Sequence, residues 1–155
     1  MEYFGNAFNA KQTFFIEKKI DKRKVLLTSY AKEFLRRVNL DRDKILYEEN
    51  RYDYAYIPLA DDLKLQYEFW FCKNGIKTCL HLEGGWVKYR NLFEEIEQKD
   101  VTEAIFYKGL FEYGYEISYF STSVDDIEFI VRLMESIYNI TSPILANNRL
   151  LPDKN

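Results

Sequence analysis

Residues 63–83, LKLQYEFWFCKNGIKTCLHLE, decide the fold that this sequence predicts. Two runs of alternating apolar and polar residues, the pattern of half-buried strands, flank Asn74-Gly75. This dipeptide readily supplies the two positive φ angles of a type I′ turn, so the stretch predicts a β-hairpin with a two-residue loop. Counting outward from the loop places Glu68 opposite His81 and sets the register of both strands.

Side chains alternate across a strand, so the predicted register sorts the hairpin onto two surfaces. The core surface is predicted to hold Leu63, Leu65, Tyr67, Phe69, Phe71, Ile76, Thr78, Leu80 and Leu82. The opposite surface is predicted to face solvent, and it holds Lys64, Gln66, Glu68, Trp70, Cys72, Lys77, Cys79, His81 and Glu83. We expect the rest of the chain to cover the core surface.

Three helices are predicted from apolar residues that recur with the helical period. The predicted helices cover residues 21–40, residues 86–98 and a segment that starts after Ser123 as N-cap and breaks or kinks at Thr141-Ser142-Pro143. Their apolar stripes are Leu27, Tyr30, Ala31, Phe34 and Val38; Tyr89, Leu92, Phe93 and Ile96; and Ile127, Ile130, Val131, Met134, Ile137 and Tyr138. Residues 1–20 show no clean period, so an irregular arm, a short strand and the first turns of a helix all stay open.

Further strands are predicted on both sides of the hairpin, with a turn near Gly109. They cover residues 52–57, 101–107 and 113–120. The order α-β-β-β-α-β-β-α favours an α+β fold, with an antiparallel sheet of about five strands and helices packed on one face. We expect a single domain over residues 1–155, with an N-terminal arm at 1–20 and a solvated tail at 147–155.

Composition excludes several classes of protein. An apolar fraction of 47% and an aromatic fraction of 17% exclude disorder as a description of this 155-residue chain. The net charge is −3, from 22 basic against 25 acidic residues with interspersed signs, so no nucleic-acid partner is expected. Two cysteines form no disulfide framework, and no signal peptide or membrane-length apolar run is present, which favours a soluble cytoplasmic protein.

The aromatic content exceeds what a core of this size needs, and such rings often line a partner-binding surface. The candidate binding residues are Trp70, Tyr52, Tyr54, Tyr56, Tyr113, Tyr115 and Tyr119. Acidic neighbours on the tyrosine-bearing strands favour a protein partner over a nucleic acid. The alternative is a tyrosine-rich sheet whose hydroxyl groups simply reach solvent. A homodimer, in which the aromatic arm reaches a second copy, also stays open.

Glu68 and His81 are the candidates for chemistry, because a carboxylate beside an imidazole can orient it as a general base. The structural alternative is a cross-strand pair that stabilises the sheet by about 0.2–1 kcal/mol. A metal site from Cys72, Cys79 and His81 is not predicted, since no short Cys-x2-Cys pair exists. No phosphate loop, nucleophile elbow or dinucleotide fingerprint is present, so no cofactor is expected.

The order of segments resembles accessory domains of bacterial restriction-type nucleases, and it is also similar to small immunity-type proteins. Neither resemblance rests on a specific motif, so no residue role is carried over from either. The sequence therefore favours a non-enzymatic protein-interaction module of the accessory, inhibitor or immunity type. The alternative is a small enzyme or ligand-binding protein centred on Glu68 and His81.

Overall fold

The structure is a computed structural model that describes residues 6–40, 46–47, 53–59, 65–97 and 101–150. Its elements in chain order are α1 (Asn6–Val38), β1 (Leu46–Tyr47), β2 (Tyr54–Pro58), β3 (Leu65–Cys72), β4 (Gly75–Glu83), the 3-10 helix η1 (Gly84–Phe93), β5 (Ala104–Phe111), β6 (Gly114–Ser121) and α2 (Ile127–Asn147). The antiparallel strands form one sheet in the order β1-β2-β3-β4-β6-β5. The predicted α+β fold is confirmed, and the short β1 is added to the predicted strands.

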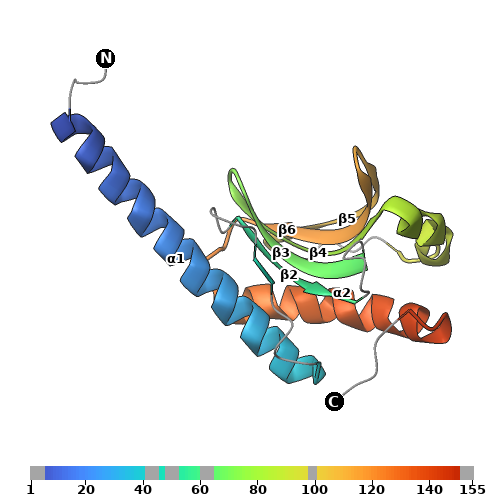
Figure 1. The fold of residues 1–155 in the computed structure, drawn as a ribbon. Helices are drawn as coiled ribbons and strands as arrows, with labels where there is room; N and C mark the ends of the chain where they lie inside the picture. Colours follow the sequence, from blue (N-terminus) through green and yellow to red (C-terminus); the bar gives the residue numbers. More distant parts are fainter. Residues whose placement is uncertain (1–5, 41–45, 48–52, 60–64, 98–100, 151–155) are drawn as a thin grey trace.

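The sheet is strongly curved, and Figure 1 shows α2 running beneath its convex face while the concave face lies on the opposite side. Both long helices pack on the convex face. The Phe34 ring of α1 lies 6.0 Å from the Phe69 ring of β3 and 6.0 Å from the Tyr138 ring of α2, measured between ring centroids. Phe69 and Leu80 are fully buried, so the predicted core surface of the hairpin is confirmed.

The register of the β3–β4 hairpin differs from the prediction by two residues. Cys72 pairs with Gly75, so the loop consists of Lys73 and Asn74. Neither Asn74 nor Gly75 has a positive φ, and the predicted type I′ turn at this dipeptide is therefore wrong. A shift of two preserves the alternation of side chains, so the hairpin residues from Leu65 to Glu83 stay on their predicted faces of the sheet, whereas Leu63 and Lys64 lie outside the described residues.

The register of the hairpin is explained by β6, the strand that pairs with the other edge of β4. A Cβ atom on Gly75 would lie 2.3 Å from the backbone oxygen of Ser121 in β6. At the far end of the same strand pair, a Cβ on Gly114 would lie 2.2 Å from the backbone oxygen of Leu82. Gly75 is thus needed for close approach of two strands, a role that competes with the turn predicted from its neighbour.

The helices also differ in detail from the prediction. Residues 6–20 belong to α1, which is the third of the alternatives left open, and the predicted helix over residues 86–98 is the 3-10 helix η1. Asp126, not Ser123, caps α2 through a hydrogen bond from the Phe129 amide. Pro143 lies inside α2 and does not end it.

Two hydrogen bonds of Thr141 hold α2 in place where the sequence predicted that it breaks or kinks. The Thr141 hydroxyl donates to the carbonyl oxygen of Ile137 and accepts from the hydroxyl of Tyr67, which ties this part of α2 to β3 just before Pro143. Gly109 lies within β5 and not in a turn. The predicted tail includes Leu150, which packs against the core, while residues 151–155 lie outside the described part of the chain.

Candidate functional site

The polar side chains in the middle of the concave face are buried, which corrects the prediction that this face is solvated, while Trp70, Lys77 and Glu83 at its margins are partly exposed. Glu68 is 3% exposed, His81 5% and Gln66 6%, and Cys79 is fully buried. Strand curvature explains this result, because a curved sheet brings its outer strands and loops over the middle of its concave face. Polar side chains that alternate with the core residues of β3 and β4 are therefore enclosed.

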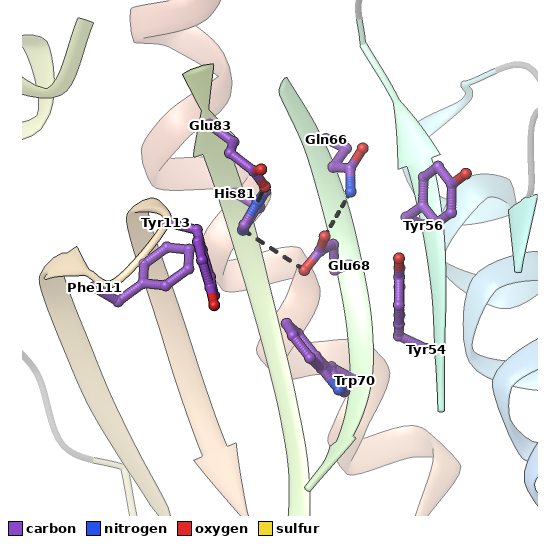
Figure 2. Close-up of a pocket in the computed structure, with 9 residues that line it drawn as sticks. All are labelled: Tyr54, Tyr56, Gln66, Glu68, Trp70, His81, Glu83, Phe111 and Tyr113. Carbon is purple, nitrogen blue, oxygen red and sulfur yellow. Dashed lines mark hydrogen bonds and ion pairs between the residues drawn. The ribbon is translucent and has the colours of Figure 1, made fainter. Parts of the chain in front are cut away.

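These side chains form the floor of a pocket of about 300 Å³. Figure 2 shows Glu68 and His81 at its centre, with Tyr54 and Tyr56 of β2 on one side and Phe111 and Tyr113 on the other. The complete lining is Tyr54, Tyr56, Gln66, Glu68, Trp70, His81, Glu83, Phe111 and Tyr113. Aromatic walls around a few polar groups are typical of small-molecule sites.

Glu68 is the most enclosed acidic group of the pocket. Its carboxylate accepts a hydrogen bond of 2.5 Å from Nε2 of Gln66, and its Oε2 lies 3.8 Å from Nδ1 of His81 and 3.6 Å from Sγ of Cys79. Burial raises the pKa of Glu68, although His81 and the bond from Gln66 oppose the shift. A buried carboxyl with a raised pKa inside a pocket is a mark of functional sites.

His81 lies between two carboxylates. Its Nε2 is 2.9 Å from Oε2 of Glu83, and its ring packs 5.2 Å from the ring of Phe111. Across the strands His81 pairs with Gln66, and Glu68 pairs with Cys79, so the predicted Glu68–His81 cross-strand pair is wrong. The two side chains are diagonal neighbours that still approach each other.

Two buried polar atoms of the floor have no hydrogen-bond partner among the described residues: Oε1 of Gln66 and Nδ1 of His81. Buried polar groups are nearly always satisfied by protein, water or ligand, since an unpaired one costs about 1–3 kcal/mol. The floor therefore has hydrogen-bonding capacity that the described protein groups do not use.

A lysine lies next to Trp70, outside the lining of the pocket. The Lys77 ammonium donates to Glu116 of β6 at 2.7 Å and lies 4.6 Å from the centroid of the Trp70 ring. Trp70 in turn packs against Tyr54, with 5.2 Å between ring centroids. The wall beside Lys77 thus already holds a cation on an aromatic face.

The structure separates the predicted binding residues into three groups. Trp70, Tyr54, Tyr56 and Tyr113 line the pocket. Tyr115 and Tyr119 are 3% and 5% exposed and pack against Phe93 and Phe106, so they do not belong to a solvent-facing surface. Tyr52 lies outside the described residues. A role in binding stays a prediction for all of them.

Sequence reasoning missed Phe111 in the pocket lining and the ion pair between Lys77 and Glu116 beside it. Glu116 reaches Lys77 because β6 pairs with β4, a neighbour relation that no local pattern in the sequence specifies. Phe111 comes from the end of β5, and Tyr113, which was among the predicted binding residues, lies in the loop that follows. The alternation in residues 113–120 could have indicated part of this arrangement, because it places Glu116 and Ser118 on the face of the strand that points away from the core.

The structure therefore defines an α+β protein with an aromatic-walled, acidic pocket on the concave face of its sheet. Comparisons with protein-family models, curated proteins and solved structures found no match for this chain. Among the described residues, no helix is long and apolar enough to cross a membrane. The same residues include no group of three or more His, Cys, Asp or Glu side chains arranged to hold a metal ion.

Proposed function

We propose that this protein binds a small organic molecule in the concave pocket, with Glu68 and His81 as its polar anchors. The supporting observation is the pair of unsatisfied atoms, Gln66 Oε1 and His81 Nδ1, beside a buried carboxylate. Polar groups that are buried without partners usually have a purpose, such as holding a ligand or water. A volume of about 300 Å³ is at the lower end of ligand sites, so the molecule is small.

This proposal takes the ligand-binding alternative of the sequence analysis over the protein-interaction module. A flat aromatic surface suits a protein partner, whereas Trp70 and Tyr54 here pack against each other at a tilt in the wall of the pocket. Of the predicted tyrosines that the structure describes, Tyr113 is the one with a large exposed fraction, 68%, and it lies at the rim of the pocket. A protein partner at this rim remains a prediction.

A screen of small molecules with neutral, anionic and cationic members tests the proposal. The readout is the indole N–H resonance of Trp70, which the Trp86→Phe variant separates from the second tryptophan of the chain. We expect at least one class of compound to shift this resonance in a saturable way. His81→Ala should abolish the shift, and Glu95→Gln, a change at an exposed residue outside the pocket, should leave it unchanged. A screen in which no compound moves the Trp70 resonance would overturn the proposal.

A further inference from the structure

We infer that the ligand of the concave pocket is an organic cation, in which a protonated amine is attached to a small aromatic or apolar body. This inference rests on the proposed function and adds the chemical class of the ligand. It follows from three properties of the pocket: its charge, its unused hydrogen-bond acceptors and its aromatic walls.

The charge of the concave face is negative around the floor. Among the residues that line the pocket, Glu68 and Glu83 carry carboxylates, and neither a lysine nor an arginine is present. Lys77 forms its ion pair with Glu116, whose side chain is 9% exposed. Glu68 has the His81 ring as its ion-pair partner at 3.8 Å among the described residues, and Lys77 acts on it from farther away. An anionic ligand would therefore meet repulsion at the floor, whereas a cation would add an opposite charge beside Glu68.

The unused hydrogen-bonding capacity consists of acceptors. Gln66 uses its amide N–H to donate to Glu68, and its oxygen, an acceptor only, is left unpartnered. When Nε2 of His81 donates to Glu83, Nδ1 of the neutral ring is also an acceptor. The distance of 3.8 Å between Nδ1 and Oε2 of Glu68 is too long for a hydrogen bond. An ammonium group has three N–H donors and no acceptor, which matches a floor of this kind.

The walls suit a cation for a separate reason. The faces of tyrosine, tryptophan and phenylalanine rings attract cations, and the ammonium of Lys77 already lies on the Trp70 face at 4.6 Å. It lies 5.9 Å from the ring of Phe111, on the opposite wall. Tyr54, Tyr56 and Tyr113 extend these walls around the floor, as Figure 2 shows. Aromatic rings around an acidic floor are the arrangement that recognises organic ammonium groups.

Three probes of similar size test the inference: benzylammonium, benzyl alcohol and benzoate. They share one ring and differ only in charge and in hydrogen-bonding groups. We expect benzylammonium to shift the Trp70 indole resonance of the Trp86→Phe protein with an affinity at least tenfold higher than that of benzyl alcohol. Benzoate should produce no saturable shift.

Variants locate the effect in the pocket. Glu68→Gln keeps the shape of the side chain but removes its charge, and it should weaken benzylammonium at least tenfold. Circular dichroism checks that this variant is folded, and Glu83→Gln, at the more exposed second carboxylate, provides an independent loss of charge. Glu95→Gln is the matched control and should bind like the parent protein.

Each result has one meaning. Equal affinity for benzylammonium and benzyl alcohol, or unchanged binding of benzylammonium to both pocket variants, overturns the assignment to cations while small-molecule binding stands. Failure of benzylammonium to bind, when neutral or anionic members of the screen do bind, also overturns it. If neither the three probes nor the screen shifts the Trp70 resonance, the proposed function itself fails.

Discussion

Glu68 is a carboxyl group enclosed on the concave face of the sheet, and its surroundings have a measurable consequence for stability. Burial raises its pKa above the value of an exposed glutamate, against the opposing effects of His81, Gln66, Lys77 and Cys79. When the folded state holds a proton more tightly than the unfolded state, stability falls as pH rises between the two pKa values. Ionised Glu68 therefore lowers the free energy of unfolding at neutral pH, and this loss is absent in acid, where the carboxyl group is protonated in both the folded and the unfolded state.

The corresponding variant is Glu68→Gln, which cannot ionise. We expect the free energy of unfolding of this variant, relative to the parent protein, to increase as pH rises from the ordinary carboxyl value of 4.5. Urea unfolding followed by circular dichroism between pH 4 and pH 8 measures the difference. If stability depends on pH in the same way in the two proteins, the pKa of Glu68 is the same in the folded and the unfolded state of the parent protein, contrary to this prediction.

At the scale of elements, the pairing of β4 with β6 depends on glycine at both ends. Gly75→Ala would place a methyl group 2.3 Å from the backbone oxygen of Ser121, and a strand backbone cannot move aside as a flexible side chain can. We expect a loss of about 1–3 kcal/mol in the free energy of unfolding, the usual cost of overpacking. Denaturant titration of the purified variant provides the measurement.

Gly85 is the matched control for this substitution. It lies in η1, and a Cβ built there meets no atom within 4 Å. We expect Gly85→Ala to change stability by less than about 0.5 kcal/mol, as most surface substitutions do. Equal losses at Gly75 and Gly85 would mean that backbone freedom, and not the approach of β6, explains the first effect.

Which elements exist was predictable, but how they pair was less so. The stripe of Leu27, Tyr30 and Phe34 predicted the packed part of α1, because burial against the sheet imposes the helical period. The register of the hairpin could not be read from Asn74-Gly75, since local turn preference competes with the steric demand of β6, a strand about 40 residues away in the sequence. Contacts between distant segments leave no periodic signal.

For the candidate site, the sequence predicted which residues share a face but not that this face encloses a pocket. Alternation along the hairpin correctly grouped Glu68, His81 and Trp70 on one face. That the face is buried depends on the curvature of the whole sheet, to which six strands contribute. Curvature on this scale has no signature in any one strand, so the sequence indicated a solvated surface where the structure has a pocket.

At the scale of the whole molecule, α1 is longer than the body that it covers. In Figure 1 its N-terminal part extends beyond the sheet, and Leu27 is the first buried residue among the α1 side chains described. We expect a protein that lacks residues 1–20 to keep its core and to melt within about 3 °C of the full chain. Differential scanning calorimetry measures this, and size-exclusion chromatography gives the oligomeric state.

The two measurements also address the predicted homodimer. A truncated protein with unchanged melting temperature and unchanged oligomeric state would mean that residues 1–20 contribute to neither the core nor an assembly. A larger fall in melting temperature, together with a change from dimer to monomer, would instead mean that this segment packs on a second copy of the chain.

The alternation of β3 and β4 divides one hairpin between two tasks. Leu65, Tyr67 and Phe69 hold the molecule together, while their immediate neighbours Gln66 and Glu68 face the hollow. Residues with these two tasks lie on opposite faces of the sheet, so substitutions of the pocket residues leave the side chains of the hydrophobic core unchanged. A combinatorial library at positions 66, 68, 70, 81 and 83 should therefore yield many well-behaved proteins, which makes this sheet a scaffold on which new specificities can be selected.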